Sequence, residues 1–469
     1  MNMEPTADDN TGKANAVVME EKTFKMRLQE YGNTTTLHGA RYIWNPKYHG
    51  MKRLIWVLLV VGLNAYLWYS IVRDLNRYFK YPVQSYVTES YTGNLTFPAV
   101  TLCNYNLFRK SAVSEDLIQF FDELFNPYSN HDADDAKWKY MDKTINESWH
   151  DFDNFVLSGA HQINDMLHSC SWSMLEPCGI ENFTQVITDW GVCYTFNNPD
   201  NISDALVISK AGIRSGLFMR LNIQQDEYAY GANLAAGFKI LLHPQGVQPL
   251  VRDYGFSVSP GFETSIAVKF MQNKNLAHPY PSNCKSIKDG TMYSQVYTVS
   301  NCLHECKINH VVQKCKCRDF RYPGNEAYCS PQKLRECIFD AEEEFEAYAK
   351  QSQDLACNCS VPCVANFYEQ KISIAFLPGG HRVEALMKEF NSSKEDIREN
   401  YLDLNIYFES LRYPIVEEIE AYSTGAMLSD IGGSMGLLAG MSLVTMVEFI
   451  DFMISTCYKK YTSRSHARV

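Results

Sequence analysis

Residues 431–447 read IGGSMGLLAGMSLVTMV, an uncharged stretch of 17 residues that follows Asp430 and ends before Glu448. At about 1.5 Å per residue, a helix of this length reaches roughly 26 Å, close to the hydrocarbon thickness of a bilayer. It contains four glycines, which leave the helix backbone exposed, and charged residues flank it. Lipid offers no hydrogen-bond partners to backbone N–H and C=O groups and does not stabilise charge. The stretch therefore predicts a membrane span that faces water or other protein.

A more ordinary span precedes it. Residues 54–72 read LIWVLLVVGLNAYLWYSIV, and Lys52 and Arg53 come just before them, while Lys459 and Lys460 follow the second span. By the positive-inside rule, both termini should be cytoplasmic. Residues 1–50 contain no apolar segment typical of a cleaved signal peptide. We expect a cytoplasmic N-terminus at 1–51, transmembrane helices at 52–73 and 427–456, an extracellular domain at 74–426 and a cytoplasmic tail at 457–469.

Cysteine placement argues against the alternative of one anchor plus a buried core helix. Of the 15 cysteines, 14 lie between the spans and only Cys457 lies beyond the second. An even set on one side of a membrane is typical of disulfides in an oxidising compartment. The Cys-x-Cys spacings at Cys315 and Cys357 resemble metal-ligand spacing, but zinc sites of this kind usually present Cys-x-x-Cys in reducing compartments. We therefore expect seven disulfides and no metal site.

Glycosylation sequons agree with this topology. Six sequons lie between the spans, at Asn94, Asn146, Asn182, Asn201, Asn358 and Asn391. Asn33 also begins a sequon, but it should stay unglycosylated if the N-terminus is cytoplasmic.

Composition excludes some classes of partner. The net charge of −11 and pI near 5.6 argue against nucleic acid, because phosphate binding needs clustered Lys and Arg. The mean hydropathy of −0.27 is that of a soluble protein, so membrane segments must be few. Hydrophobic periodicity in the middle region predicts a mixed α+β domain. We expect strands at 97–103, 205–208, 238–242, 372–376 and 404–408, and helices at 114–125, 153–167, 301–312, 331–350 and 381–390.

The second span contains a candidate ion pathway. A glycine and a hydroxyl at Gly440-Met441-Ser442 can open a helix and present carbonyls to an ion, as in selectivity filters. Glu448 and Asp451, one turn apart, would form carboxylate rings if several subunits surrounded an axis.

Two other interpretations of this span are possible. Gly436 and Gly440 form a small-x-x-x-small pair that could serve helix packing alone. Residues 432–436 match the Gly-x-Ser-x-Gly elbow of hydrolases, which requires a strand, a sharp turn and a helix around Ser434. A serine within a membrane helix makes the elbow the weaker alternative.

Four motifs together resemble the degenerin/epithelial sodium channel family, and particularly its acid-sensing and peptide-gated branches. They are Leu37-His38-Gly39 before the first span, FPAVTLCN from Phe97 after it, the order of the 14 cysteines, and LSDIGGSMGLLAGMSLVTMVEFIDF from Leu428 to Phe452. The resemblance covers nearly the whole chain. It implies an ion channel in the plasma membrane, not an enzyme, with no cofactor and with sodium as the permeant ion.

The resemblance also implies an architecture and residue roles. The channel would be a homotrimer, or a heterotrimer with related subunits, with palm, finger, thumb, knuckle and β-ball parts above six helices in the lipid bilayer. Gly440, Met441 and Ser442 would form the filter, and Ser429, Asp430 and Gly433 the extracellular gate. His38 and Gly39 would belong to a re-entrant segment at the cytoplasmic entry, and Leu411-Arg412 to a gating linker. The implied disulfides are Cys103–Cys193, Cys170–Cys178, Cys284–Cys363, Cys302–Cys359, Cys306–Cys357, Cys315–Cys337 and Cys317–Cys329.

Departures from the family pattern matter more for the stimulus than for the pore. Acid-sensing members carry histidines just outside the first span, whereas residues 78–83 read YFKYPV. We therefore expect an amiloride-sensitive, ligand-gated sodium channel opened by an extracellular neuropeptide, since the acidic exterior would attract a basic peptide. Gating by acid or by a small molecule is the alternative within the family. A non-conducting two-span receptor or ectoenzyme is the alternative outside it.

Overall fold

The computed structural model describes residues 26, 29–45, 47–125, 152–173, 176–229, 235–351 and 357–466. The chain forms two compact units: Met1–Gln84 with Glu420–Val469, and Ser85–Ile419. The first unit contains both predicted spans, and the second contains most of the region between them. The predicted sequon at Asn146 lies outside the described residues.

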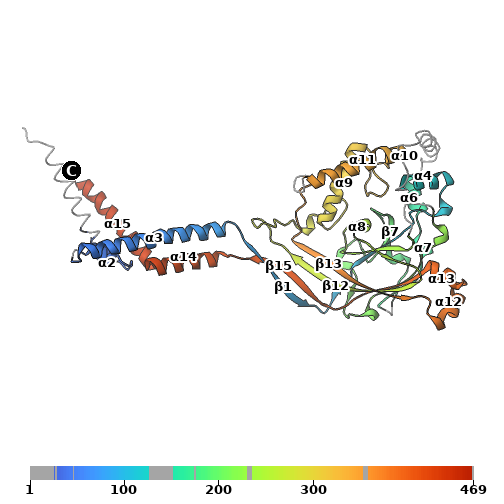
Figure 1. Cartoon of the computed structure of the whole chain (residues 1–469), viewed down its shortest axis with the longest axis horizontal. Coiled ribbons are helices and arrows are strands. Elements are labelled where there is room, and N and C mark those ends of the chain that lie inside the picture. The colour runs from blue at the N-terminus through green and yellow to red at the C-terminus, as the bar shows by residue number, and fades with distance from the viewer. Residues whose placement is uncertain are drawn as a thin grey trace, which may run out of the picture. The chain divides into compact units, whose positions relative to one another are not determined.

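The first unit is helical (Figure 1). It comprises α2 (Ala40–Trp44), α3 (Gly50–Tyr78), α14 (Thr424–Ala439) and α15 (Leu443–His466). Among the described residues, α3 alone is long and apolar enough to cross a membrane as one straight helix. α14 and the first part of α15 pass the same test together, as one broken span bent by 72°. The first predicted span thus lies inside a longer helix, and the second is interrupted.

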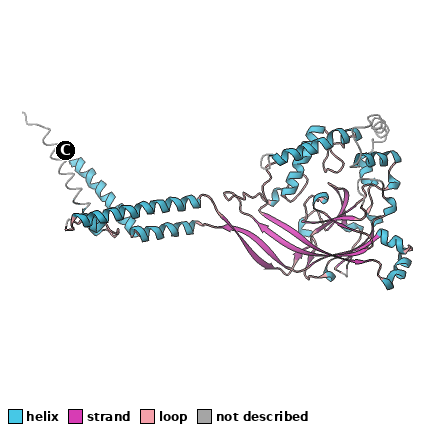
Figure 2. Cartoon of the chain, in the orientation of Figure 1, coloured by secondary structure: helices cyan, strands magenta, loops and turns pink. Residues whose placement is uncertain are grey.

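The second unit is built on two larger sheets and one small one (Figure 2). The eight-stranded sheet has the order β1-β15-β12-β14-β9-β4-β5, with β13 paired to β12, and the five-stranded sheet has the order β11-β10-β3-β7-β6. β2 pairs with β8. The strands are β1 (Val83–Tyr91), β2 (Leu95–Thr96), β3 (Ala99–Asn104), β4 (Leu167–Trp172), β5 (Glu176–Pro177), β6 (Phe183–Thr188), β7 (Gly191–Phe196), β8 (Val207–Ile208), β9 (Leu217–Asn222), β10 (Phe238–His243), β11 (Phe256–Val258), β12 (Phe262–Lys274), β13 (Val364–Phe376), β14 (Tyr401–Phe408) and β15 (Arg412–Glu420).

The main core is shared by the two larger sheets. In β9, buried and half-buried residues alternate, so that Leu217, Met219 and Leu221 point into the core. All six residues of β3 are buried, because this strand lies in the middle of its sheet and is covered on both faces. Phe97 packs edge-on against Phe408 of β14, with ring centroids 5.8 Å apart. Apolar burial between the sheets thus holds the second unit together.

A second core lies among the helices of this unit. It joins α4, α6, α9 and α11 through residues such as Phe120, Val156, Ile308 and Ala341. The helices are α4 (Glu115–Phe125), α6 (Phe152–Gly159), α7 (Ile163–Met166), α8 (Val251–Tyr254), α9 (Val299–Cys315), α10 (Pro331–Lys333), the π-helix η8 (Leu334–Ile338), α11 (Phe339–Gln351), α12 (Val383–Phe390) and α13 (Lys394–Asn400).

Two helix predictions were wrong in extent. The helix predicted at 153–167 ends at Gly159, α7 is separate, and Leu167 begins β4. Between α6 and α7, His161 is buried and bonded by its ring to Gln224, so tertiary contacts set the break. The helix predicted at 331–350 contains the π-helix, which carries the disulfide-bonded Cys337.

Seven disulfides lie in the second unit, and their pairs are those implied by the family resemblance. They are Cys103–Cys193, Cys170–Cys178, Cys284–Cys363, Cys302–Cys359, Cys306–Cys357, Cys315–Cys337 and Cys317–Cys329. The Cys-x-Cys pairs are therefore crosslinks and not metal ligands. Among the described residues, the free cysteine is Cys457, which is exposed.

Candidate pore site

The second span is broken at the segment predicted to form the filter. α14 ends at Ala439, and Gly440 has φ +65°, a left-handed conformation that glycine adopts without steric cost. The N–H of Met441 donates to the carbonyl of Met435 at 3.1 Å. α15 then starts at Leu443, leaving Gly440, Met441 and Ser442 in a short non-helical link. The bend of 72° is therefore explained by a glycine-terminated helix.

The His38-Gly39 segment packs against this break. The N–H of His38 donates to the carbonyl of Ala439 at 3.0 Å, satisfying a helix-end carbonyl that has no partner within α14. A Cβ added at Gly440 would lie 2.3 Å from Cγ of the His38 ring. Gly39 has φ +84°, and a Cβ there would meet Val60 of α3 at 2.6 Å. Two glycines thus permit close contact between the N-terminal segment, α3 and the end of α14.

Hydroxyl groups connect the same segment to the start of α15. Thr36 Oγ1 lies 2.6 Å from Thr445 Oγ1, which also accepts the N–H of Ser442 at 3.1 Å. In return, Ser442 Oγ accepts the N–H of Thr445 at 3.3 Å. This reciprocal pair satisfies amide groups at the beginning of α15 and fixes Ser442 relative to the helix.

The two pore carboxylates predicted from the sequence lie on α15. Glu448 is half-buried and accepts a long 3.4 Å hydrogen bond from Thr36, whereas Asp451 is exposed. One turn further, Phe452 stacks on Tyr31 with ring centroids 4.6 Å apart. The carboxylates are thus on a helix that the N-terminal segment holds at two points.

The predicted gate residues lie near the start of α14. Ser429, Asp430 and Gly433 are exposed within this chain, and a Cβ at Gly433 would meet no atom of the described residues within 4 Å. The hydroxyl of Tyr422 donates to Asp430 Oδ2 at 2.8 Å, and the guanidinium of Arg77 lies 4.5 Å from the Tyr422 ring centre. These contacts join the C-terminal end of α3 to the N-terminal end of α14.

The hydrolase alternative fails on geometry. Gly432, Ser434 and Gly436 all lie inside α14, so there is no strand-to-helix turn to expose the serine. The elbow motif in this sequence is a coincidence of a glycine-rich helix.

The structure describes both residues of the predicted gating linker and five of the six sequons predicted between the spans. Leu411 is buried in the main core, and Arg412 begins β15 with its guanidinium 3.9 Å from the exposed carboxylate of Glu89. All five described sequons of the middle region have an exposed asparagine, at Asn94, Asn182, Asn201, Asn358 and Asn391.

Titratable groups of the second unit divide into buried and exposed sets. Burial lowers the pKa of His243 and of His304 to about 4, and it also lowers the pKa of His161. His168 is partly exposed instead, with Nε2 3.7 Å from Glu389 Oε1. Arg220 lies 3.7 Å from the same carboxylate.

Sequence reasoning missed part of the pore site. Thr36 and Thr445 have no local motif, since each gains its role from a residue about 400 positions away. The bond between Tyr422 and Asp430 also went unpredicted, although their spacing of eight residues across the start of α14 could have suggested it.

Comparison with known proteins supports the channel interpretation. The profile of the family described as amiloride-sensitive sodium channel matches residues 31–452. Acid-sensing ion channel 1 of Gallus gallus is 32% identical over 94% of this chain and 86% of its own length. Acid-sensing ion channel 2 of Rattus norvegicus is 32% identical over 92% and 87%.

The solved structure of a proton-activated chloride channel aligns with 88% of this chain and covers 96% of its own chain. The TM-score is 0.33 and the sequence identity is 8%, so this similarity is too low to indicate a shared fold or function. The resemblance drawn from the four sequence motifs is confirmed. The chain belongs to the amiloride-sensitive sodium channel family, whose members are plasma-membrane ion channels and not enzymes.

Proposed function

We propose that this chain is a subunit of an amiloride-sensitive, sodium-selective cation channel whose filter is Gly440-Met441-Ser442. The observation that carries this proposal is the break of the second span at Gly440, stabilised by His38. A non-helical link within a span is tolerated only where it lines a cavity or is buried in protein. Carbonyls at such a link can replace the hydration shell of an ion.

Three subunits around an axis would complete this pore. Ser429, Gly433 and Gly436 are spaced by four and three, so they share one face of α14, and a Cβ at Gly433 or Gly436 would meet no atom of the described residues within 4 Å. A helix face of this kind allows close approach of neighbouring spans. Glu448 and Asp451 would then form rings that concentrate cations. We expect both termini in the cytoplasm, with glycans on the extracellular sequons.

For the trigger, acid is the first candidate. The similar proteins of chicken and rat are named as acid-sensing. In the second unit, His168 and Arg220 each lie 3.7 Å from a carboxylate oxygen of Glu389 on α12.

A basic extracellular peptide is the second candidate. The net charge of −11 would attract such a ligand and raise its local concentration. Residues 78–83 contain no histidine, so the stimulus need not be the proton.

The test is whole-cell recording from cells that express the chain alone. We expect an inward sodium current that amiloride blocks, opened by a step to pH 5 or by an amidated peptide ending in Arg-Phe-amide. Ser429 replaced by a bulkier residue should give a standing current if neither stimulus works, because an enlarged side chain would hold the predicted gate open. Surface-labelled protein without current under all three conditions would contradict the channel proposal.

A further inference from the structure

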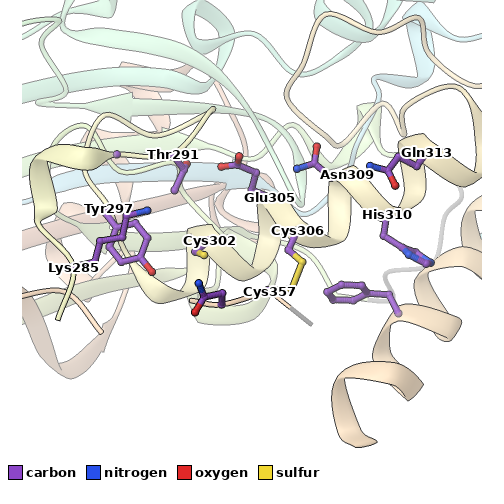
Figure 3. Close-up of a pocket in the computed structure, with 13 residues that line it drawn as sticks. Lys285, Thr291, Tyr297, Cys302, Glu305, Cys306, Asn309, His310, Gln313 and Cys357 are labelled. Carbon is purple, nitrogen blue, oxygen red and sulfur yellow. A yellow bond between two sulfur atoms is a disulfide. The ribbon is translucent and has the colours of Figure 1, made fainter. Parts of the chain in front are cut away.

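A groove of about 640 Å³ runs along α9 in the second unit (Figure 3). Its floor is the stripe Cys302, Glu305, Cys306, Asn309, His310 and Gln313, which recur at helical spacing on one face of α9. Lys285, Thr291 and Tyr297 line one end in Figure 3, and His310 and Gln313 lie at the other. This volume lies within the range of about 300–1,000 Å³ typical of small-ligand sites.

The groove offers unused polar groups. The side-chain amides of Asn309 and Gln313 are exposed and make no hydrogen bond to the part of the chain that the structure describes. Glu305 accepts the N–H of Met292 at 2.8 Å through one oxygen. Each amide can both donate and accept, and a carboxylate has further acceptor sites. Such a lining suits a ligand rich in hydroxyl and amide groups.

One wall of the groove contains a glycosylation sequon. Asn358 begins Asn358-Cys359-Ser360, is exposed and lines the groove. The disulfides Cys306–Cys357 and Cys302–Cys359 attach the residues on both sides of it to the floor helix. Tyr297 also holds this segment by donating its hydroxyl to the carbonyl of Ser360 at 2.7 Å.

We propose that Asn358 carries an N-linked glycan and that the groove along α9 seats its first sugars. N-acetylglucosamine presents hydroxyl and acetamide groups, which match the amides of Asn309 and Gln313. The sugars are tethered to the groove wall, so binding is intramolecular and weak contacts are sufficient for occupancy. The two disulfides fix the attachment point, which lowers the entropy lost on binding.

The experiment measures access of an endoglycosidase to each glycan. The full channel is purified in detergent from cells, digested natively or after reduction and denaturation, and each sequon is followed by glycopeptide mass spectrometry. We expect native cleavage at Asn358 to be at least about tenfold slower than in denatured protein. This ratio corresponds to a free energy of about 1.4 kcal/mol for binding of the glycan in the groove. Exposed glycans, for example at Asn94, should show nearly equal rates.

Matched variants separate groove binding from general shielding. Asn309→Ala with Gln313→Ala should bring native cleavage at Asn358 to within about twofold of the denatured rate, while Gln332→Ala, an exposed helical amide outside the groove, should leave it slow. Ser360→Ala removes the sequon without removing the carbonyl that Tyr297 uses, and it should raise hydrogen exchange across residues 302–313. An unmodified Asn358 in wild-type protein would overturn the proposal. So would fast native cleavage, or protection that survives the groove variants.

Discussion

Gly440 has two properties that no other residue type combines at this position. Its φ of +65° costs a residue with a side chain about 1–2 kcal/mol, and a Cβ would overlap the ring of His38. We expect Gly440→Ala to abolish most of the current while leaving the amount of protein at the cell surface within about twofold. Gly62→Ala is the control, because a Cβ at Gly62 in α3 meets no atom within 4 Å in the part of the chain that the structure describes. Normal current from the Gly440 variant would contradict the close packing of His38.

His243 gives the second unit a pH-dependent stability. Its Nε2 lies 2.8 Å from Thr101 Oγ1 and its Nδ1 lies 2.9 Å from the carbonyl of Pro244. Burial lowers the pKa of His243 to about 4, so the unfolded chain binds a proton at a higher pH than the folded chain does. As pH falls from about 6.5 to 4, the free energy of unfolding should decrease by about 1.4 kcal/mol per pH unit from this group.

Thermal unfolding of purified protein at pH 7, 6 and 5 measures this dependence. His243→Gln should show a smaller loss of stability with acid than wild type, whatever its stability at pH 7. An identical pH slope in both proteins would rule out His243 as the source.

Arg220 neutralises a buried carboxylate in the larger sheet. It donates two hydrogen bonds to Asp403, of 2.6 and 2.8 Å, and Asp403 is 5% exposed. Arg220→Met would leave that charge without its partner, so we expect a loss of roughly 1.5–3 kcal/mol in the free energy of unfolding. Lys371, which pairs with Glu409 at the surface, is the control, and Lys371→Met should change the unfolding midpoint little. Equal effects of the two substitutions would show that burial does not set the strength of the Arg220 pair.

At the scale of elements, the junction of α14 and α15 depends on the N-terminal segment. Thr36 and Thr445 are in hydroxyl contact, so Thr36→Val and Thr445→Val should be non-additive in the midpoint of channel activation. Residues in contact commonly couple by about 0.5–3 kcal/mol. Thr36→Val combined with Ser455→Ala should be additive, because the Ser455 hydroxyl bonds within α15. Additivity in the first pair would exclude the contact from gating.

The elements were predictable from the sequence where local pattern decides them. The uncharged run at 54–72 predicted α3, and alternation or β-branching located strands such as β10 and β14 to within a few residues. The π-helix and the break at His161 depend on a disulfide and on a buried ring, which periodicity does not encode. The sequence also predicted that the helix could open at Gly440. It did not predict the contact of Gly440 with His38, because the two residues are about 400 positions apart in the chain.

At the scale of the molecule, the two units are joined by two short connections. β1 begins five residues after the end of α3, and α14 begins four residues after the end of β15. Both chain connections between the second unit and the proposed pore therefore run through these short segments. The proposed trimer would repeat both connections around the axis and bring three Ser442 side chains to the predicted filter.

The reversal potential of the current under sodium inside and potassium outside, then reversed, tests the central claim most directly. The proposed sodium-selective filter at Gly440–Ser442 predicts a clear preference for sodium in wild type. It also predicts that replacing Ser442 by a larger residue shifts the reversal potential toward equal permeability, with surface expression intact. An unchanged sodium preference in the Ser442 variant would contradict the assignment of the filter.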